Sequence, residues 1–112
     1  MSAVTFPEVF NLADYFLFDR LKEGMGAEVA LRFGDRTWTY ADVASRTEGV
    51  AALLRDAGLR HEERALIVLP DLPPFAWTFF GVLKAGGVIA MGNPDATTGD
   101  LAYLLEYTRA SV

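Results

Sequence analysis

Cysteine is absent from this chain of 112 residues, so the chain forms no disulfide bonds and offers no thiolate ligands to a metal. Histidine occurs once, as His61, and one imidazole without further ligands does not make a zinc site. Long apolar runs are missing too, since none approaches the roughly 18 to 20 residues that cross a bilayer. Residues 1–5 lack the basic region and apolar core of a secretory signal, and we expect a cytoplasmic protein without a membrane partner.

Basic side chains are fewer than acidic ones. Lysine and arginine number 10 against 15 acidic residues, which gives a formal net charge of -5. Binding of nucleic acid needs a concentrated basic face, so we expect no nucleic-acid partner. Hydrophobic residues, in contrast, make up 52% of the chain, which is more than a free-standing soluble domain of this length usually carries. We therefore expect one domain, or part of one, with apolar surface that a partner covers.

Residues 1–60 predict a helix, a β-hairpin and a second helix. Asn11 is a good N-cap for a first helix that ends at Gly24, with an apolar face of Leu12, Phe16, Leu17 and Leu21. Residues 28–38 alternate in part and turn at Gly34 and Asp35, which is typical of a hairpin with Val29, Leu31 and Phe33 on one side. Thr39 and Asp42 form a capping-box pattern for a helix that ends at Gly58, with a face of Val43, Thr47, Val50 and Leu54.

Residues 61–112 predict the start of a parallel sheet. The unbroken apolar run 65–69 is typical of a strand covered on both faces. Pro73 and Pro74 fit a loop and first helical turn, and the helix that follows to residue 85 has almost no polar face, so we expect it to be buried nearly all round. Residues 88–91 then form a second strand, parallel to the first.

A fourth helix and a further strand complete the pattern. Thr97 and Asp100 repeat the capping pattern before Leu101, Leu104, Leu105 and Thr108, and residues 109–112 look like the approach to a third strand. The fold class is therefore α/β, with a lead-in over 1–60 and the start of a parallel βα sheet over 61–112. We see no complete domain boundary and expect an incomplete domain.

Three segments carry a resemblance to a known family. They are residues 10–15 (FNLADY), residues 37–43 (TWTYADV) and residues 83–94, which begin LKAGGV. In this order and spacing they resemble amino-terminal landmarks of the adenylate-forming superfamily of acyl-CoA ligases, peptide-synthetase adenylation domains and luciferases. The opening from Phe10 to Gly24 is most similar to benzoate-CoA-type ligases, which activate aromatic carboxylic acids.

The resemblance implies a two-step reaction in the parent enzyme. A carboxylate attacks the α-phosphate of ATP to give an acyl-adenylate and pyrophosphate, and the thiol of CoA then displaces AMP, with Mg²⁺ neutralising phosphate charge. The family's phosphate loop, ribose-binding acid, metal-binding Glu and mobile Lys have no counterparts in this sequence. We therefore predict that the chain is the amino-terminal portion of the large domain, inactive alone, and that the rest of the enzyme is its partner. We assign it no catalytic, cofactor-binding or metal-binding residue.

Several residues invite a functional reading. Gly86 and Gly87 are not a phosphate cradle, because such a loop runs from strand into helix and this pair runs from helix into strand. We interpret Lys84 as a solvent-reaching cation that complements the helix dipole rather than a CoA ligand, and His61 as a solvated imidazole. Trp77, Phe79 and Phe80 are read as core rather than as an aryl pocket.

The strand ends are where ligands gather in open α/β sheets, here residues 70–73 and 92–95. Some members of the family carry an Arg after the Asn-Pro pair as a contact for CoA, but this chain has Asp95, which weakens that expectation.

Three functions stay open on the sequence alone. The first is a segment of an aromatic-acid CoA ligase. The second is a segment of a peptide-synthetase adenylation domain or an acyl-AMP ligase, which use another acceptor. The third is a stand-alone α/β interaction or receiver-like module with Asp71 at a strand end, although a receiver needs more acidic strand ends and a five-stranded sheet.

Overall fold

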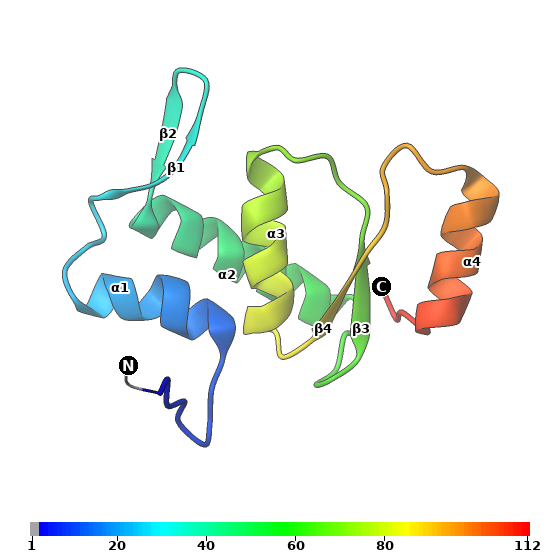
Figure 1. Ribbon diagram of the computed structural model, residues 1–112, viewed down its shortest axis with the longest axis horizontal. Helices are drawn as coiled ribbons and strands as arrows, with labels where there is room; N and C mark the ends of the chain where they lie inside the picture. Colours follow the sequence, from blue (N-terminus) through cyan, green and yellow to red (C-terminus); the bar gives the residue numbers. More distant parts are fainter. Residues whose placement is uncertain (1–2) are drawn as a thin grey trace.

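The computed structural model describes residues 3–112. Met1 and Ser2, the first two residues of the segment predicted to lack a secretory signal, lie outside the described residues. In Figure 1 residues 12–39 lie at one end of the molecule, residues 64–67 and 88–112 lie at the other, and the helices 40–56 and 73–84 lie between them. We call the first group of residues the first lobe and the second group the second lobe. The elements, in order, are η1 (Asp14–Phe18), α1 (Asp19–Lys22), β1 (Val29–Phe33), β2 (Arg36–Thr39), α2 (Tyr40–Asp56), β3 (Arg64–Ile67), α3 (Pro73–Lys84), β4 (Val88–Met91) and α4 (Thr98–Thr108). The chain is mixed α/β, and among residues 3–112 no helix has the length and hydropathy to span a bilayer.

The first helix forms as predicted but with a different buried face. Asn11 Oδ1 accepts hydrogen bonds from the backbone N–H groups of Ala13 (2.9 Å) and Asp14 (3.3 Å), and Gly24 ends the helix with φ of 83°. The prediction that Phe16 faces the core is wrong, since Phe16 is 53% exposed while Leu17 is buried. The cause is the π-helical winding of η1, whose wider turn brings residues five apart onto one face.

The hairpin and second helix follow their local signals. β1 and β2 pair antiparallel, with Gly34 at φ 58° in the turn. A register irregularity between Val29 and Leu31 breaks the predicted common face, and only Leu31 of β1 is even half-buried. In α2, Thr39 and Asp42 form the predicted capping box, and Gly58 follows the helix at φ 99°.

The second lobe contains the predicted parallel pair. β3 and β4 are parallel, with Arg64 opposite Val88 and Ile67 opposite Met91. The expectation that β3 is covered on both faces is wrong for the described residues, since Ala65 and Ile67 are buried while Leu66 is only half-buried. β3 also ends at Ile67, two residues earlier than predicted.

The chain beyond α4 returns to β3. The Ser111 N–H donates to Arg64 O and the Leu66 N–H donates to Val112 O, both at 2.8 Å. Residues 111 and 112 therefore lie along β3 on the side away from β4, as the predicted approach to a third strand requires. α4 begins with Thr97 Oγ1 accepting the Asp100 N–H at 3.2 Å, which confirms the predicted N-cap.

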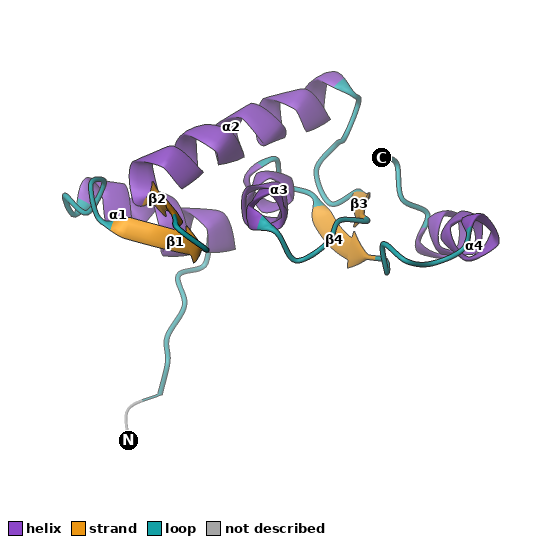
Figure 2. Cartoon of the chain, turned by 90° about the horizontal axis from the view of Figure 1, so that it is seen from above, coloured by secondary structure: helices purple, strands orange, loops and turns teal. Residues whose placement is uncertain are grey.

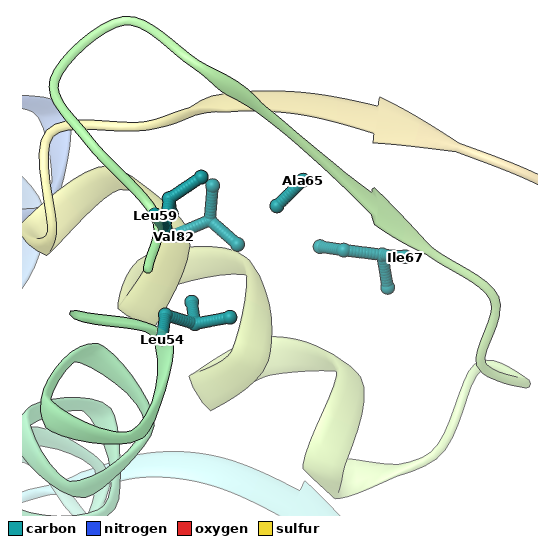
Figure 3. Packing of buried hydrophobic residues seen from close by; sticks show 5 residues of the cluster. All are labelled: Leu54, Leu59, Ala65, Ile67 and Val82. Atoms are coloured by element: carbon teal, nitrogen blue, oxygen red, sulfur yellow. The ribbon is translucent and has the colours of Figure 1, made fainter. Parts of the chain in front are cut away.

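The core has two clusters joined by α2 and α3. Figure 3 shows the cluster of the second lobe, made of Leu54, Leu59, Ala65, Ile67 and Val82. The first-lobe cluster contains Leu17, Trp38, Val43 and Ala44, with Trp77 and Phe80 of α3 packed against it. α2 runs along one side of α3, while α4 lies at the far end of the molecule, beyond the sheet (Figure 2).

The helix α3 is less covered than its composition predicts. Only Gly81 and Val82 of this helix are buried, and most of its remaining residues are half-buried. The prediction of burial nearly all round is therefore wrong within residues 3–112, because α2 and the sheet cover only part of its circumference.

Candidate functional site

The carboxyl ends of β3 and β4 form one edge of the sheet, as their parallel pairing requires. The Gly92 N–H donates to Ile67 O at 2.9 Å, which holds the two strand exits together. Segments 70–73 and 92–95 both leave from this edge, as the predicted parallel pairing requires.

The segment 92–95 is a tight turn with an acidic tip. Asn93 Oδ1 accepts the Asp95 N–H at 2.9 Å, so the Asn93 side chain shapes the turn. A Cβ on Gly92 would lie 3.2 Å from Leu104 Cδ1, which shows how closely α4 approaches this turn. Asp95 is exposed, and its carboxylate places negative charge where the family resemblance implied a cation.

The segment 70–73 faces the hairpin. Asp71 and Leu72 line a hollow of about 220 Å³ together with Leu31, Arg32 and Phe33 of β1. Asp71 is exposed, and among residues 3–112 no group of three or more His or acidic side chains could hold a metal ion.

Gly86 and Gly87 lie at the opposite, amino edge of the sheet. Gly86 has φ of 83°, its N–H donates to Leu83 O, and the Gly87 N–H donates to Val82 O. These bonds close the last turn of α3, which is the predicted C-cap. A Cβ on Gly86 would lie 2.8 Å from His61 Nδ1, and the His61 side chain is 81% exposed, as predicted for a solvated imidazole.

Lys84 is paired, contrary to the prediction of a solvent-reaching cation. Its Nζ lies 2.6 Å from Asp14 Oδ1 and 4.2 Å from the centroid of the Phe18 ring. One residue earlier, Leu83 O accepts a hydrogen bond of 2.7 Å from Asn11 Nδ2. Two of the family-like segments, residues 10–15 and 83–94, therefore meet in one contact, which we call the helix joint (Asn11, Asp14, Leu83 and Lys84).

Two carboxylates with structural hydrogen bonds, Asp42 and Glu63, have lowered pKa values. The hydrogen bond from the Thr39 backbone N–H and, to a smaller extent, that from the Thr39 hydroxyl hold the pKa of Asp42 below its ordinary value. Both come from the residue that caps α2. The Ser111 hydroxyl and then the Arg60 backbone N–H lower the pKa of Glu63. Neither carboxylate belongs to the segments 70–73 and 92–95 that leave the carboxyl edge of the sheet.

Of the three aromatic residues of α3 that were predicted to be core, two pack against a buried cluster as partly buried side chains. Trp77 and Phe80 pack against the first-lobe cluster, and Phe79 stacks with Phe75 at 6.3 Å between ring centroids. Trp77 also has a second environment that sequence patterns missed. It lies 6.0 Å from Trp38, and the guanidinium groups of Arg36 and Arg46 lie 4.8 Å from the Trp38 and Trp77 rings respectively.

The described residues do not fit ATP, Mg²⁺ or CoA. A triphosphate requires clustered backbone N–H donors with a cation, and the glycine pair of this chain closes a helix at the amino edge of the sheet instead. Lys84, two residues before this glycine pair, is paired with Asp14. At the carboxyl edge of the sheet, the exposed carboxylate of Asp95 would repel a CoA phosphate. We therefore derive no chemical step through these groups for this chain.

Comparison with known proteins gives one consistent grouping. A family model described as AMP-binding enzyme matches residues 18–112. The chain is 31% identical to the benzoate–CoA ligase of Thauera aromatica over 111 residues, 98% of this chain and 21% of that protein. It is 32% identical to the long-chain-fatty-acid–CoA ligase of Bacillus subtilis (strain 168) over 85 residues, 76% of this chain and 15% of that protein.

A solved structure confirms the fold. A benzoate CoA ligase from Burkholderia xenovorans LB400 superposes with a TM-score of 0.80 and 34% identity, over 91% of this chain and 20% of that one. The chain therefore spans 15–21% of the length of these three proteins, and its α/β architecture is that of the corresponding part of the solved structure.

Proposed function

Since the chain belongs to the family of AMP-binding enzymes, we propose that it forms the amino-terminal part of the large domain of an acid–CoA ligase that activates an aromatic carboxylic acid. In that reaction the carboxylate and ATP give an acyl-adenylate and pyrophosphate, and the acyl group is then transferred to the thiol of CoA with release of AMP. The whole of residues 1–112 is assigned to this one domain, with 1–60 as lead-in and 61–112 as the start of its parallel sheet.

The observation that carries the proposal is the share of this chain over which each relative is similar. The similarity to the Thauera aromatica benzoate–CoA ligase extends over 98% of the chain, including the helix joint, whereas that to the Bacillus subtilis fatty-acid ligase covers 76%. This difference supports an aromatic acid. The comparable identity of the second match keeps an aliphatic acid as the competing substrate.

The contribution of this chain is structural. It supplies β3 and β4, held by α2 and α3, and fixes the first helix to the end of α3 through the helix joint. We assign the binding of ATP, Mg²⁺ and CoA, and the catalytic groups, to the remaining part of the enzyme, which is the partner of this chain.

The test is carboxylate-dependent exchange of pyrophosphate into ATP. The purified chain alone should show no exchange above the blank with benzoate, a hydroxybenzoate or a long-chain fatty acid. The chain added to a benzoate–CoA ligase lacking its corresponding segment should restore exchange. Exchange by the rigorously purified chain alone would contradict the structural role.

A second experiment, on the complete enzyme that contains this chain, tests its substrate and its acceptor. The enzyme that contains this chain should release AMP with benzoate-type acids only when CoA is present as acceptor. A preference for fatty acids would contradict the aromatic assignment, and transfer to a carrier protein instead of CoA would favour an adenylation domain.

A further inference from the structure

The outward side of α4 carries two exposed aromatic residues. Tyr103 and Tyr107 lie one turn apart, are 62% and 73% exposed, and stack with 5.7 Å between ring centroids. The opposite side of the helix holds the half-buried residues Leu101, Leu104 and Thr108. Since α4 lies at the end of the molecule (Figure 2), the tyrosines point away from the elements on which this helix packs.

Two carboxylates flank the tyrosines. Asp100 precedes Tyr103 by three positions and Glu106 follows it by three, so both acids lie on the tyrosine side of the helix, one turn from the ring. Both are exposed, and within residues 3–112 neither carboxylate has an ion pair or a hydrogen bond. We call Asp100, Tyr103, Glu106 and Tyr107 the α4 face.

The acids of the α4 face have no cation on their own segment. Residues 85–108 contain three acids but no lysine, arginine or histidine. Two arginines lie at the carboxyl end of the helix, where Arg64 Nε donates to Thr108 O at 2.8 Å and Arg109 follows α4 with φ of 54°. Neither forms an ion pair with the α4 face among residues 3–112, so the face is acidic without compensation.

The exposed side of α2 has the composition of an ordinary solvated helix surface. It carries both signs of charge, with Arg46 and Arg55 together with Glu48 and Asp56. The α4 face differs, because its charges have one sign and its other residues are tyrosines, which are enriched where proteins bind one another. Its composition is therefore that of a binding surface.

The α4 face also differs from the uncovered side of α3. Residues 73–83 carry no charge, so further elements of a larger domain can cover α3 without burying a charged group. Covering the α4 face in the same way would desolvate two unpaired carboxylates, which is costly. The α4 face therefore suits the outside of such a domain.

We propose that the α4 face binds an arginine-bearing segment of a separate polypeptide. A guanidinium stacks on the ring of Tyr103 and donates from its edge to the carboxylate of Asp100 or Glu106. A convex helix surface does not enclose a small ligand, and its charge repels nucleic acid. A symmetric pair of copies would place acid against acid. The proposal does not rest on the proposed function.

The test is binding of a defined peptide. A labelled decapeptide of alternating arginine and alanine, with blocked ends, is titrated with the chain at low ionic strength, and fluorescence anisotropy is measured. The parent chain should bind saturably, and Asp100→Asn/Glu106→Gln should weaken binding at least about tenfold, because charged hydrogen bonds are lost. No saturable binding by the parent would overturn the proposal.

The matched control removes the same charge from α2. Glu48→Gln/Asp56→Asn should bind the peptide like the parent, and equal weakening by the two double variants would overturn the site. The same peptide with lysine in place of arginine should bind at least about threefold more weakly, since stacking on tyrosine favours guanidinium. Equal binding of the two peptides would overturn the assignment of arginine.

A measurement on the parent chain covers the case in which a variant does not fold. In heteronuclear NMR spectra, the peptide should shift the backbone amide resonances of residues 100–107. Binding that leaves them unmoved would overturn the proposal.

Two further results would give the α4 face another occupant and overturn the proposal. Loss of self-association in Asp100→Asn/Glu106→Gln, measured by sedimentation, would assign the face to a second copy of the chain. A peptide that binds the chain but not the complete enzyme containing it would assign the face to the enzyme's own remaining part.

Discussion

Asn11 stabilises the ends of two helices with one side chain. Its Oδ1 accepts the first free N–H groups of the amino-terminal helix, and its Nδ2 donates to Leu83 O at the last turn of α3. The N-cap was predictable because it involves residues two and three apart. The second bond was not, because it joins residues 72 apart and no local pattern encodes that distance.

At the residue scale, Gly81 sets the separation of α2 and α3. A Cβ at this position would lie 2.5 Å from Val50 Cγ1 and 3.3 Å from Thr47 O. We predict that Gly81→Ala lowers the free energy of unfolding by about 1–3 kcal/mol, because overpacking outweighs the gain in helix propensity. Chemical denaturation measures the effect.

Gly49 is the matched control for that substitution, since it also lies within a helix but a Cβ there meets nothing within 4 Å. Gly49→Ala should leave the stability unchanged or raise it by up to about 1 kcal/mol. Adding Val50→Ala to Gly81→Ala should recover part of the loss. Equal effects of the two glycine substitutions would contradict a close crossing at Gly81.

The ion pair of the helix joint should contribute measurably. Lys84 and Asp14 are 2.6 Å apart with side chains 30% and 46% exposed. A double-mutant cycle with Lys84→Gln and Asp14→Asn should give a coupling of about 0.5–1 kcal/mol in unfolding free energy. The exposed pair Lys22 and Asp19, at 3.8 Å, should give a coupling near zero. A cycle that reads zero for both pairs would contradict the importance of the joint.

At the scale of elements, the structure confirms what depends on neighbours in sequence. The caps at Thr39 and Thr97, the turn at Gly34 and the strand Val88–Met91 all formed as predicted. The burial of the faces of strands and helices was predicted less well. An apolar run such as β3 indicates a capacity for burial, but other elements decide which faces are covered.

For the candidate site, too, features that depend on local sequence were predicted, and features that combine distant segments were not. Parallel pairing was enough to predict that segments 70–73 and 92–95 leave one edge. The arginine and tryptophan cluster was missed because β2, α2 and α3 each contribute a part of it. The spacing of Arg36 and Trp38, two apart on a strand and so on one face, was the one available signal.

The contact between Glu63, directly before β3, and Ser111 near the chain end should depend on pH. Glu63 accepts hydrogen bonds from Ser111 Oγ (2.5 Å) and from the Arg60 N–H (2.8 Å), which lower its pKa in the folded state. A carboxylate whose folded pKa is depressed stabilises the fold above its ordinary pKa of 4.5, and that contribution is lost as pH falls through the folded value.

We therefore predict that the free energy of unfolding decreases as pH is lowered from about 5. Ser111→Ala removes the largest cause of the Glu63 shift, so its unfolding free energy should fall less steeply with acid than that of the parent. Denaturation curves between neutral and acid pH measure both slopes. The Asp42 capping box adds the same acid dependence to both proteins, so it cancels in the comparison. Parallel curves would contradict the role of Ser111.

At the scale of the whole molecule, the sheet of the second lobe is open. β4 pairs with β3 alone among the strands of residues 3–112, which leaves its outer edge unpaired. Val88 and Met91 of this strand are 45% and 61% exposed. An open edge with exposed apolar side chains promotes association with other chains.

The chain should therefore bind apolar dyes and self-associate. Met91→Lys places a charge at the open edge, and we predict that it reduces both dye fluorescence and the associated fraction measured by analytical ultracentrifugation. The midpoint of unfolding should change little, because Met91 is mostly exposed in the folded chain. Ser45→Lys, on the exposed side of α2, adds the same charge away from the sheet and should leave association unchanged. A parent chain that is monodisperse, unfolds cooperatively and binds no dye would show that the β4 edge is not an association surface.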